Sequence, residues 1–159
     1  MRRTLSIALI LAACAFLISL IYADLPFTPV ADNFSASDSN VSASSTILIA
    51  DRVVRVTVAD TPEERERGLS GWKGLAEDEG MLFIFNEDGR YAFWMKDMEF
   101  PIDILWISRD GAIVHIEEYV APETYPASFA PRREARYVVE LPAGFVERRG
   151  VRIGELVRL

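Results

Sequence analysis

Between residues 47 and 159, turn-forming residues divide the chain into short apolar runs. The runs 81–85, 102–107 and 112–119 each follow directly on a Gly or a Pro. Runs of about five to eight residues are typical of strands, because a helix generally needs about ten or more. We therefore predict about seven or eight short strands with one or two short helices, a pattern that indicates a β-sandwich or a small barrel.

Two local patterns support this mainly β prediction. Over 54–58, valines alternate with polar residues, which is typical of a half-buried strand. In 61–69, Thr61, Pro62 and Glu64 are typical of the first turn of a helix, with Thr61 and Glu64 forming a capping box. No regular alternation of strands with helices follows, so we do not expect a parallel α/β sheet.

The charge and the rare residue types exclude several classes of function. The formal net charge is −7, and the chain has a single cysteine, Cys14, and a single histidine, His115. An acidic chain lacks the excess of Lys and Arg that neutralises phosphates, so we expect no nucleic-acid partner. One thiol and one imidazole cannot supply the usual ligands of a zinc site. We therefore predict no metal, no cofactor and no disulfide.

The first 23 residues predict export. Arg2 and Arg3 precede residues 4–23, which carry no charge and are long enough to cross a hydrocarbon core of ~30 Å as a helix. Three interpretations stay open: an uncleaved signal anchor, a secretory signal cut after Ala23, or a lipoprotein box, LAAC, in which Cys14 is lipidated. All three place the remainder of the chain outside the cytoplasm, membrane-anchored or secreted.

A compositional change separates this segment from the folded part. Residues 24–46 are rich in Ser, Ala, Asn, Asp and Pro, and their apolar residues follow neither a helical nor a strand period. This composition is typical of a flexible linker. We therefore divide the chain into a signal anchor or signal peptide, 1–23, a Ser/Ala-rich linker, 24–46, and one β-sandwich domain, 47–159.

The segment 90-RYAFWMKDMEFPIDILWI-107 places charged residues in an otherwise apolar run and contains the main candidate site. In an extended chain, Trp94 and Lys96 point to one side and make a wall with an apolar base and a cationic tip. Asp97 lies at an expected turn, and Asp103 stands one residue inside the next strand. Two interpretations stay open: a structural Lys96–Asp103 pair, or a ligand pocket in which Trp94 stacks while Lys96 and Asp103 form hydrogen bonds.

Two further polar residues are candidates for the same ligand site. His115 has Glu117 two residues on, an arrangement that can orient the imidazole but offers a metal only two ligands. The alternative is that His115 only forms hydrogen bonds with neighbouring residues and has no role in binding. Glu140 follows the apolar residues 137–139 and can end a strand near the same rim; the alternative is a solvated strand end.

Three segments resemble the family known as domain of unknown function 192, which consists of uncharacterised conserved prokaryotic proteins. They are 63-EERERGLSGWKGLAEDEGMLFIF-85, 93-FWMKDMEFPIDILWI-107 and 137-YVVELPAG-144, and the resemblance covers nearly all of residues 53–159. It implies a jelly-roll-like β-sandwich, and exported or membrane-tethered proteins are common in the family. Where the family usually has Asn-Thr after the FWMK tetrapeptide, this chain has Asp97 and Met98.

The leading prediction is a membrane-tethered extracytoplasmic β-sandwich that binds a small ligand or an envelope component. No nucleophile elbow, phosphate loop or HExxH motif occurs in the sequence, so we predict no catalytic residues. A protein-interaction or accessory domain in envelope biogenesis is the first alternative. A metal-independent enzyme that uses Lys96, Asp103 and His115 is the second. The expected partners are the membrane, through residues 4–23, and a small molecule or an envelope protein.

Overall fold

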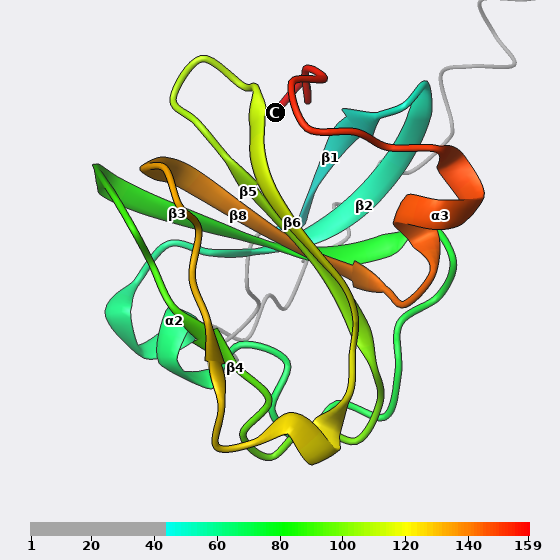
Figure 1. Ribbon diagram of the computed structural model, residues 1–159. Coiled ribbons are helices and arrows are strands. Elements are labelled where there is room, and N and C mark those ends of the chain that lie inside the picture. The colour runs from blue at the N-terminus through cyan, green and yellow to red at the C-terminus, as the bar shows by residue number, and fades with distance from the viewer. Residues whose placement is uncertain (1–43) are drawn as a thin grey trace, which may run out of the picture. The chain divides into compact units, whose positions relative to one another are not determined.

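Residues 44–159 are described by the computed structural model of this chain, which Figure 1 shows. The predicted anchor, 1–23, nearly all of the predicted linker and the candidate lipidation site Cys14 lie outside the described residues. Within 44–159, no helix is long and apolar enough to cross a membrane.

The described residues form a mainly β domain with one six-stranded mixed sheet and one two-stranded sheet. In spatial order, the large sheet contains β1 (Ser44–Ile49), β2 (Arg52–Ala59), β3 (Glu79–Gly89), β8 (Ala135–Pro142), β5 (Ile102–Ile107) and β6 (Ile113–Val120). The small sheet pairs β4 (Phe93–Trp94) with β7 (Ser128–Phe129). The helices are α2 (Pro62–Arg67), α3 (Phe145–Arg149) and the short 3₁₀ turn η1 (Pro122–Thr124). The prediction of a mainly β fold with short helices is confirmed.

One pair of neighbouring strands is parallel. β2 runs parallel to β3, and α2 lies in the connection between them, whereas the other pairings in the large sheet are antiparallel. The sequence pattern does not indicate this unit, because α2 has six residues, none of them buried, and so lacks the apolar face that periodicity detects. The start of α2 is as predicted: Glu64 N donates to Thr61 Oγ1, and the Glu64 side chain accepts from Thr61 N.

β5 lies inside the large sheet and is buried on both faces, and its sequence is apolar except for Asp103. All six residues of β5 are buried. Leu105 and Ile107 belong to one core cluster, whereas Ile102, Ile104 and Trp106 belong to another. Because successive side chains of a strand point to opposite faces, the two clusters lie on opposite sides of the sheet.

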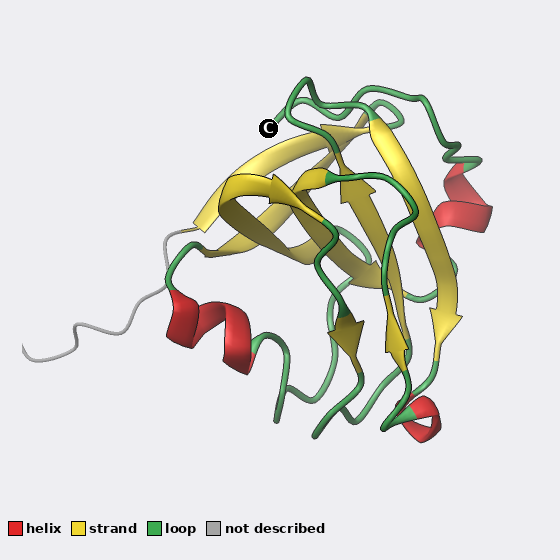
Figure 2. Cartoon of the chain, turned by 60° about the vertical axis from the view of Figure 1, so that its left-hand side comes forward, coloured by secondary structure: helices red, strands yellow, loops and turns green. Residues whose placement is uncertain are grey.

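α2 and the β4–β7 ribbon cover the face that carries Trp106. Leu69, just after α2, and Met95, just after β4, are each 1% exposed and belong to the cluster on this face. β7 lies within 120–135, where three prolines indicate an irregular loop. The sequence indicates a strand over 91–95, but β4 contains only Phe93 and Trp94. Figure 1 shows α2 near β4 at one end of the sheet and α3 at the other, and Figure 2 shows the strong curvature of the strands between them.

β3 is longer than its sequence indicates. Residues 86–89 read as a turn, but they form the end of β3. Arg136 on β8 holds this extension, because its guanidinium donates to Asp88 Oδ1 at 2.7 Å and to the backbone oxygen of Asn86. Arg136 is 48 residues from Asp88 along the chain, so the sequence around residues 86–89 does not indicate this contact.

The sequence of residues 151–159 indicates a strand that closes the fold, but the structure forms no strand there. These residues make two isolated bridges instead, one between Leu48 and Arg158 and one between Ala112 and Leu156. Leu48 belongs to the edge strand β1, and Ala112 directly precedes the other edge strand, β6. Because the tail crosses from one edge of the sheet to the other, it cannot pair continuously with either.

Candidate functional site

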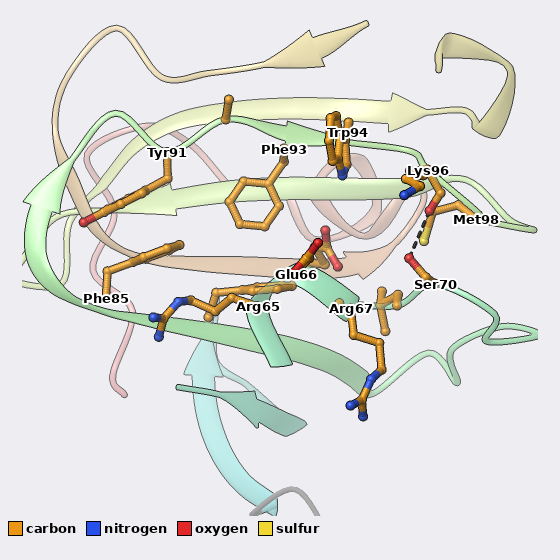
Figure 3. A pocket seen from close by; sticks show the side chains of 15 residues that line it. Arg65, Glu66, Arg67, Ser70, Phe85, Tyr91, Phe93, Trp94, Lys96 and Met98 are labelled. Carbon is orange, nitrogen blue, oxygen red and sulfur yellow. Dashed lines mark hydrogen bonds between the residues drawn. The ribbon is translucent and has the colours of Figure 1, made fainter. Parts of the chain in front are cut away.

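A pocket of about 270 Å³ lies between α2 and the segment around β4. Its lining residues are Arg65–Ser70 from α2 and the turn after it, Phe83 and Phe85 from β3, Tyr91–Trp94 with Lys96 and Met98 from β4 and its flanks, and Glu140 from β8. Figure 3 shows the aromatic side chains that precede and form β4 along one side of the pocket, opposite Arg65 and Arg67 of α2. The pocket therefore has one aromatic wall and one charged wall.

The aromatic wall is held in place by contacts among the rings themselves. Phe93 meets Phe83 and Trp106 edge-to-face, with ring centroids 4.8 Å and 5.9 Å apart. Phe85 and Tyr91 are stacked, with centroids 3.5 Å apart and planes within 8° of parallel. Pairs of this kind contribute about 0.5–1.5 kcal/mol beyond their burial. The wall is therefore held in place by its own packing.

Trp94 is the part of this wall that faces solvent. It is 53% exposed and lies edge-on to Tyr125, which is 47% exposed, with centroids 6.3 Å apart. Its backbone is fixed by the pairing of Trp94 with Ser128 in the β4–β7 ribbon. Large aromatic side chains that are this exposed and lie beside a pocket are typical of binding surfaces. Trp94 and Tyr125 therefore make an aromatic rim.

Glu140 lies at the base of the pocket, in the interior strand β8. Its partners across the sheet are Met81 on β3 and Ile104 on β5, so apolar residues flank it on both sides. Glu140 is 5% exposed, and within 44–159 no group forms a hydrogen bond with its Oε2 atom. Burial disfavours the carboxylate and raises the pKa of Glu140 to about 8. The carboxyl is therefore mostly neutral at pH 7, and Glu140 is not a solvated strand end.

Three cationic side chains border the pocket, and only one of them forms hydrogen bonds within the described structure. Arg65 donates to two backbone carbonyl oxygens, and its guanidinium lies 5.2 Å from the centroid of the Phe85 ring. Arg67 and Lys96 are exposed, and neither side chain has a hydrogen-bonding or ion-pair partner in the described part of the chain. Ser70 Oγ donates to the Lys96 backbone oxygen at 3.0 Å, the dashed line in Figure 3. Arg67 and Lys96 therefore remain available to an anion.

Asp103 does not pair with Lys96, and the expected ion pair is absent from the described structure. The Asp103 side chain is fully buried on the face of β5 opposite Trp106. Its carboxylate accepts hydrogen bonds from the backbone N–H groups of Tyr119 at 2.9 Å, Gly144 at 3.1 Å and Val146 at 2.9 Å. Three donors compensate a buried charge well. Asp103 therefore has a structural role, which is to connect β5 with the start of α3.

His115 and Asp97 also lie outside the pocket lining. His115 Nε2 is 2.9 Å from Glu117 Oε1, and the imidazole centroid is 5.2 Å from that of Trp106, so its neighbours satisfy it. Asp97 is exposed at a turn, with φ of 56°, and its backbone oxygen accepts a hydrogen bond from Gly71. In residues 44–159 no group of three potential metal-ligating side chains comes together.

The structure thus brings Trp94, Lys96 and Glu140 to one pocket and places the other three candidates elsewhere. Of the three residues in the enzyme alternative, Lys96 lines this pocket, whereas Asp103 and His115 do not. Sequence reasoning missed Arg67 and Ser70, which come from α2 and the turn after it. A sequence signal for Arg67 does exist. The capping box fixes where α2 begins, and Arg67 then falls in the last turn of this short helix.

The fold and the site together define a class: a small, mainly β domain with an aromatic-walled pocket over a buried carboxyl group. The chain belongs to the DUF192 family, whose model, described as "Uncharacterized ACR", matches residues 45–159. The resemblance seen in the sequence is therefore confirmed. No curated protein matches the chain.

Two crystal structures are similar to this domain. A "putative transcription regulator" from Sinorhizobium meliloti 1021 is 36% identical, with a TM-score of 0.69, and the match covers 73% of this chain and 93% of that one. A protein of unknown function from Novosphingobium aromaticivorans DSM 12444 is 24% identical, with a TM-score of 0.70 and coverage of 73% and 85%. The second likeness concerns the fold alone.

Proposed function

We propose that this protein binds a small ligand in the pocket between α2 and β4. The observation that carries the proposal is Glu140, whose carboxyl is buried at the base of the pocket while Oε2 lacks a partner within 44–159. A buried polar group without a partner destabilises a fold by about 1–3 kcal/mol, and an apolar residue in its place avoids this loss. A ligand that forms a hydrogen bond with Glu140 supplies the missing partner.

The other lining residues take roles that fit this arrangement. Trp94 lies at the mouth, where its exposed ring can stack on the ligand. Lys96 and Arg67 border the same opening, where their charges can contact a polar group of the ligand. Apolar walls with a few convergent polar groups are typical of small-molecule sites.

The test is a thermal-shift screen of the full-length protein against sugars, nucleotides and small organic acids. A ligand that raises the melting temperature of the wild type should lose that effect in Trp94→Ala and in Lys96→Ala. Lys73→Ala is the matched control, because Lys73 is an exposed lysine that pairs with Glu99 outside the pocket lining. A ligand whose effect survives both pocket variants, or is lost equally in the control, contradicts the proposed site.

A second candidate function is recognition of an envelope protein, and the aromatic rim favours it. Trp94 and Tyr125 expose two large rings side by side, and such residues are enriched at protein interfaces. Tyr125→Ala separates the two functions, because Tyr125 is part of the rim but not of the pocket lining. Loss of a protein partner in Tyr125→Ala, with the small-ligand response intact, assigns the rim to protein binding.

The description of the Sinorhizobium relative as a transcription regulator does not lead us to propose DNA binding. The net charge of this chain is −7, and the cations at the pocket border a small cavity rather than an extended surface. Non-specific affinity for DNA rests on several phosphate contacts, each made by Lys or Arg.

We also propose that residues 4–23 tether the domain to a membrane with its site outside the cytoplasm. The uncharged segment behind Arg2 and Arg3 supports this. Membrane fractionation and the mass of the mature chain separate the three forms of export. A full-length mass on the membrane indicates an anchor, whereas release from the membrane in Cys14→Ser indicates a lipoprotein, and a soluble chain that begins after Ala23 indicates a cleaved signal.

For the fold, we propose that the domain is a reduced form of the predicted jelly-roll-like β-sandwich or barrel. The curved six-stranded sheet and the two-stranded β4–β7 sheet over one of its faces support this description. The bridges from the C-terminal tail to the two edges of the large sheet support a barrel-like closure at one end.

A further inference from the structure

We infer that the ligand of this pocket is a small ring-bearing carboxylic acid, whose carboxylate accepts a hydrogen bond from the protonated Glu140 side chain. The inference rests on the proposed ligand-binding function and adds the chemical class of the ligand. It also assigns Glu140 a defined state, namely a neutral hydrogen-bond donor at the base of the pocket.

Glu140 has a hydrogen bond to offer a ligand in this pocket. Its two flanking strand partners, Met81 and Ile104, are apolar, and Oε2 has no partner within 44–159. Burial raises the pKa of Glu140 to about 8, so at neutral pH the group carries a proton that it can donate. A carboxylate accepts such a bond strongly, because a charged acceptor makes shorter and stronger hydrogen bonds than a neutral one.

The charged side chains around Glu140 favour an anionic ligand. The titratable groups that line the pocket with Glu140 are Arg65, Glu66 and Arg67 from α2, Tyr91 from the connection before β4, and Lys96 from the turn after it. Three of these side chains are cationic and one, Glu66, is anionic. With Glu140 neutral, the lining therefore carries a net positive charge, which favours an anionic ligand over a cationic one.

The size and the walls of the pocket suit a small aromatic ligand. A volume of about 270 Å³ lies just below the usual range for drug-sized ligands, so the ligand has the size of a single substituted ring. Phe83 and Phe93 line the interior, and Trp94 lies at the mouth with its ring half-exposed. A flat ring against this wall lets its carboxylate reach Glu140, and the charges of Lys96 and Arg67 attract the anion to the same pocket.

The experiment compares three probes of equal shape, namely benzoate, benzamide and benzylamine, on the full-length protein in lipid nanodiscs. Saturation-transfer NMR measures the affinity of each probe at about pH 6 and about pH 9. We expect benzoate to bind more tightly than benzamide at about pH 6, and benzylamine to bind most weakly. Because benzoate is ionised at both pH values, its affinity should fall about tenfold as Glu140 loses its proton.

Glu140→Gln is the decisive variant, since an amide keeps a neutral donor at this position and cannot ionise. We expect this variant to bind benzoate at about pH 6 within a fewfold of the wild type and to lose the pH dependence. In Lys96→Ala, benzoate affinity should fall severalfold while the pH dependence stays, and Lys73→Ala should match the wild type in both respects.

The outcomes separate this inference from the proposed function. If benzylamine or benzamide binds more tightly than benzoate, and Trp94→Ala abolishes that binding, the pocket is a ligand site but the inferred class is wrong. If benzoate binds with the same affinity at both pH values, the role of the Glu140 proton is wrong. If no probe binds, and the wider screen gives no ligand that depends on Trp94, both the function and the inference are overturned.

Discussion

Glu140 is the residue whose surroundings match its chemistry least. It is an acid between apolar strand partners, and its pKa rises from an ordinary value of 4.5 to about 8 through burial alone. The folded chain therefore holds a proton that the unfolded chain releases between these two pH values. Since the folded state then binds more protons than the unfolded state, the free energy of unfolding falls as the pH rises from about 4.5 to about 8.

Glu140→Gln should remove this loss of stability. The shift from 4.5 to about 8, at about 1.4 kcal/mol per pH unit, sets an upper limit of about 5 kcal/mol for the gain above pH 8. Urea unfolding of both proteins at about pH 5 and about pH 9 measures it, and the difference should grow with pH. Glu66→Gln is the control, because Glu66 is an exposed carboxylate of the same pocket. Equal pH dependence in wild type and Glu140→Gln contradicts the assignment.

The sequence could reveal only those site residues that are close to one another along the chain. Trp94 and Lys96 lie two positions apart near one strand, so their common direction follows from the period of the backbone. Glu140 comes to the same pocket from a strand 44 positions beyond Lys96, and no local pattern connects them. The partners of Asp103 are backbone N–H groups, which every residue except proline carries, so the sequence does not distinguish them from any others.

At the scale of elements, Asp103 attaches the start of α3 to the sheet through hydrogen bonds. α3 has only five residues. Its N-cap residue is Gly144, whose φ of 79° suits glycine. An added Cβ at Gly144 would also come within 2.5 Å of Tyr119 Oη, so the glycine is needed for space as well. Asp103 accepts from Gly144 and Val146 on one side and from Tyr119, at the end of β6, on the other.

Asp103→Asn should therefore destabilise the fold although it keeps the shape of the side chain. The amide NH₂ replaces one acceptor oxygen and faces a backbone N–H, so a buried donor loses its partner at a cost of about 2–4 kcal/mol. Urea unfolding measures the loss. Asp97→Asn is the matched control: Asp97 is exposed at positive φ, where asparagine is well tolerated, and its effect should stay within about 0.5 kcal/mol. A stable Asp103→Asn protein would show that the three bonds matter little.

At the scale of the whole molecule, the C-terminal tail limits the exposure of two sheet edges. Leu48 N donates to the Arg158 oxygen at 2.9 Å and Arg158 N donates back at 3.0 Å, while Val157 N donates to Gly111 on the far side. Val157 is 5% exposed and packs in the core cluster that faces away from the pocket. The tail thus caps backbone groups at both ends of the strand order, where unpaired edges promote association.

Deletion of residues 154–159 should lower the free energy of unfolding by more than about 2 kcal/mol, because it removes the buried Val157 and the edge hydrogen bonds. It should also cause concentration-dependent association through the freed edges of β1 and β6. Urea unfolding and gel filtration measure the two effects. Leu156→Ser, a change at a 68% exposed side chain of the same tail, should alter neither. A shortened chain that stays monomeric and equally stable contradicts this role of the tail.

Several features were determined by the sequence itself, because they depend on neighbours along the chain. The short apolar runs specify strands, the Thr61–Glu64 capping box specifies where α2 begins, and the period of two assigns the side chains of β5 to two faces. The tertiary structure alone decided which polar residues share a pocket, that Asp103 holds α3, and that the tail joins both sheet edges. Burial, hydrogen-bond partners and a raised pKa depend on residues that are distant in the chain, and only the folded arrangement brings those residues together.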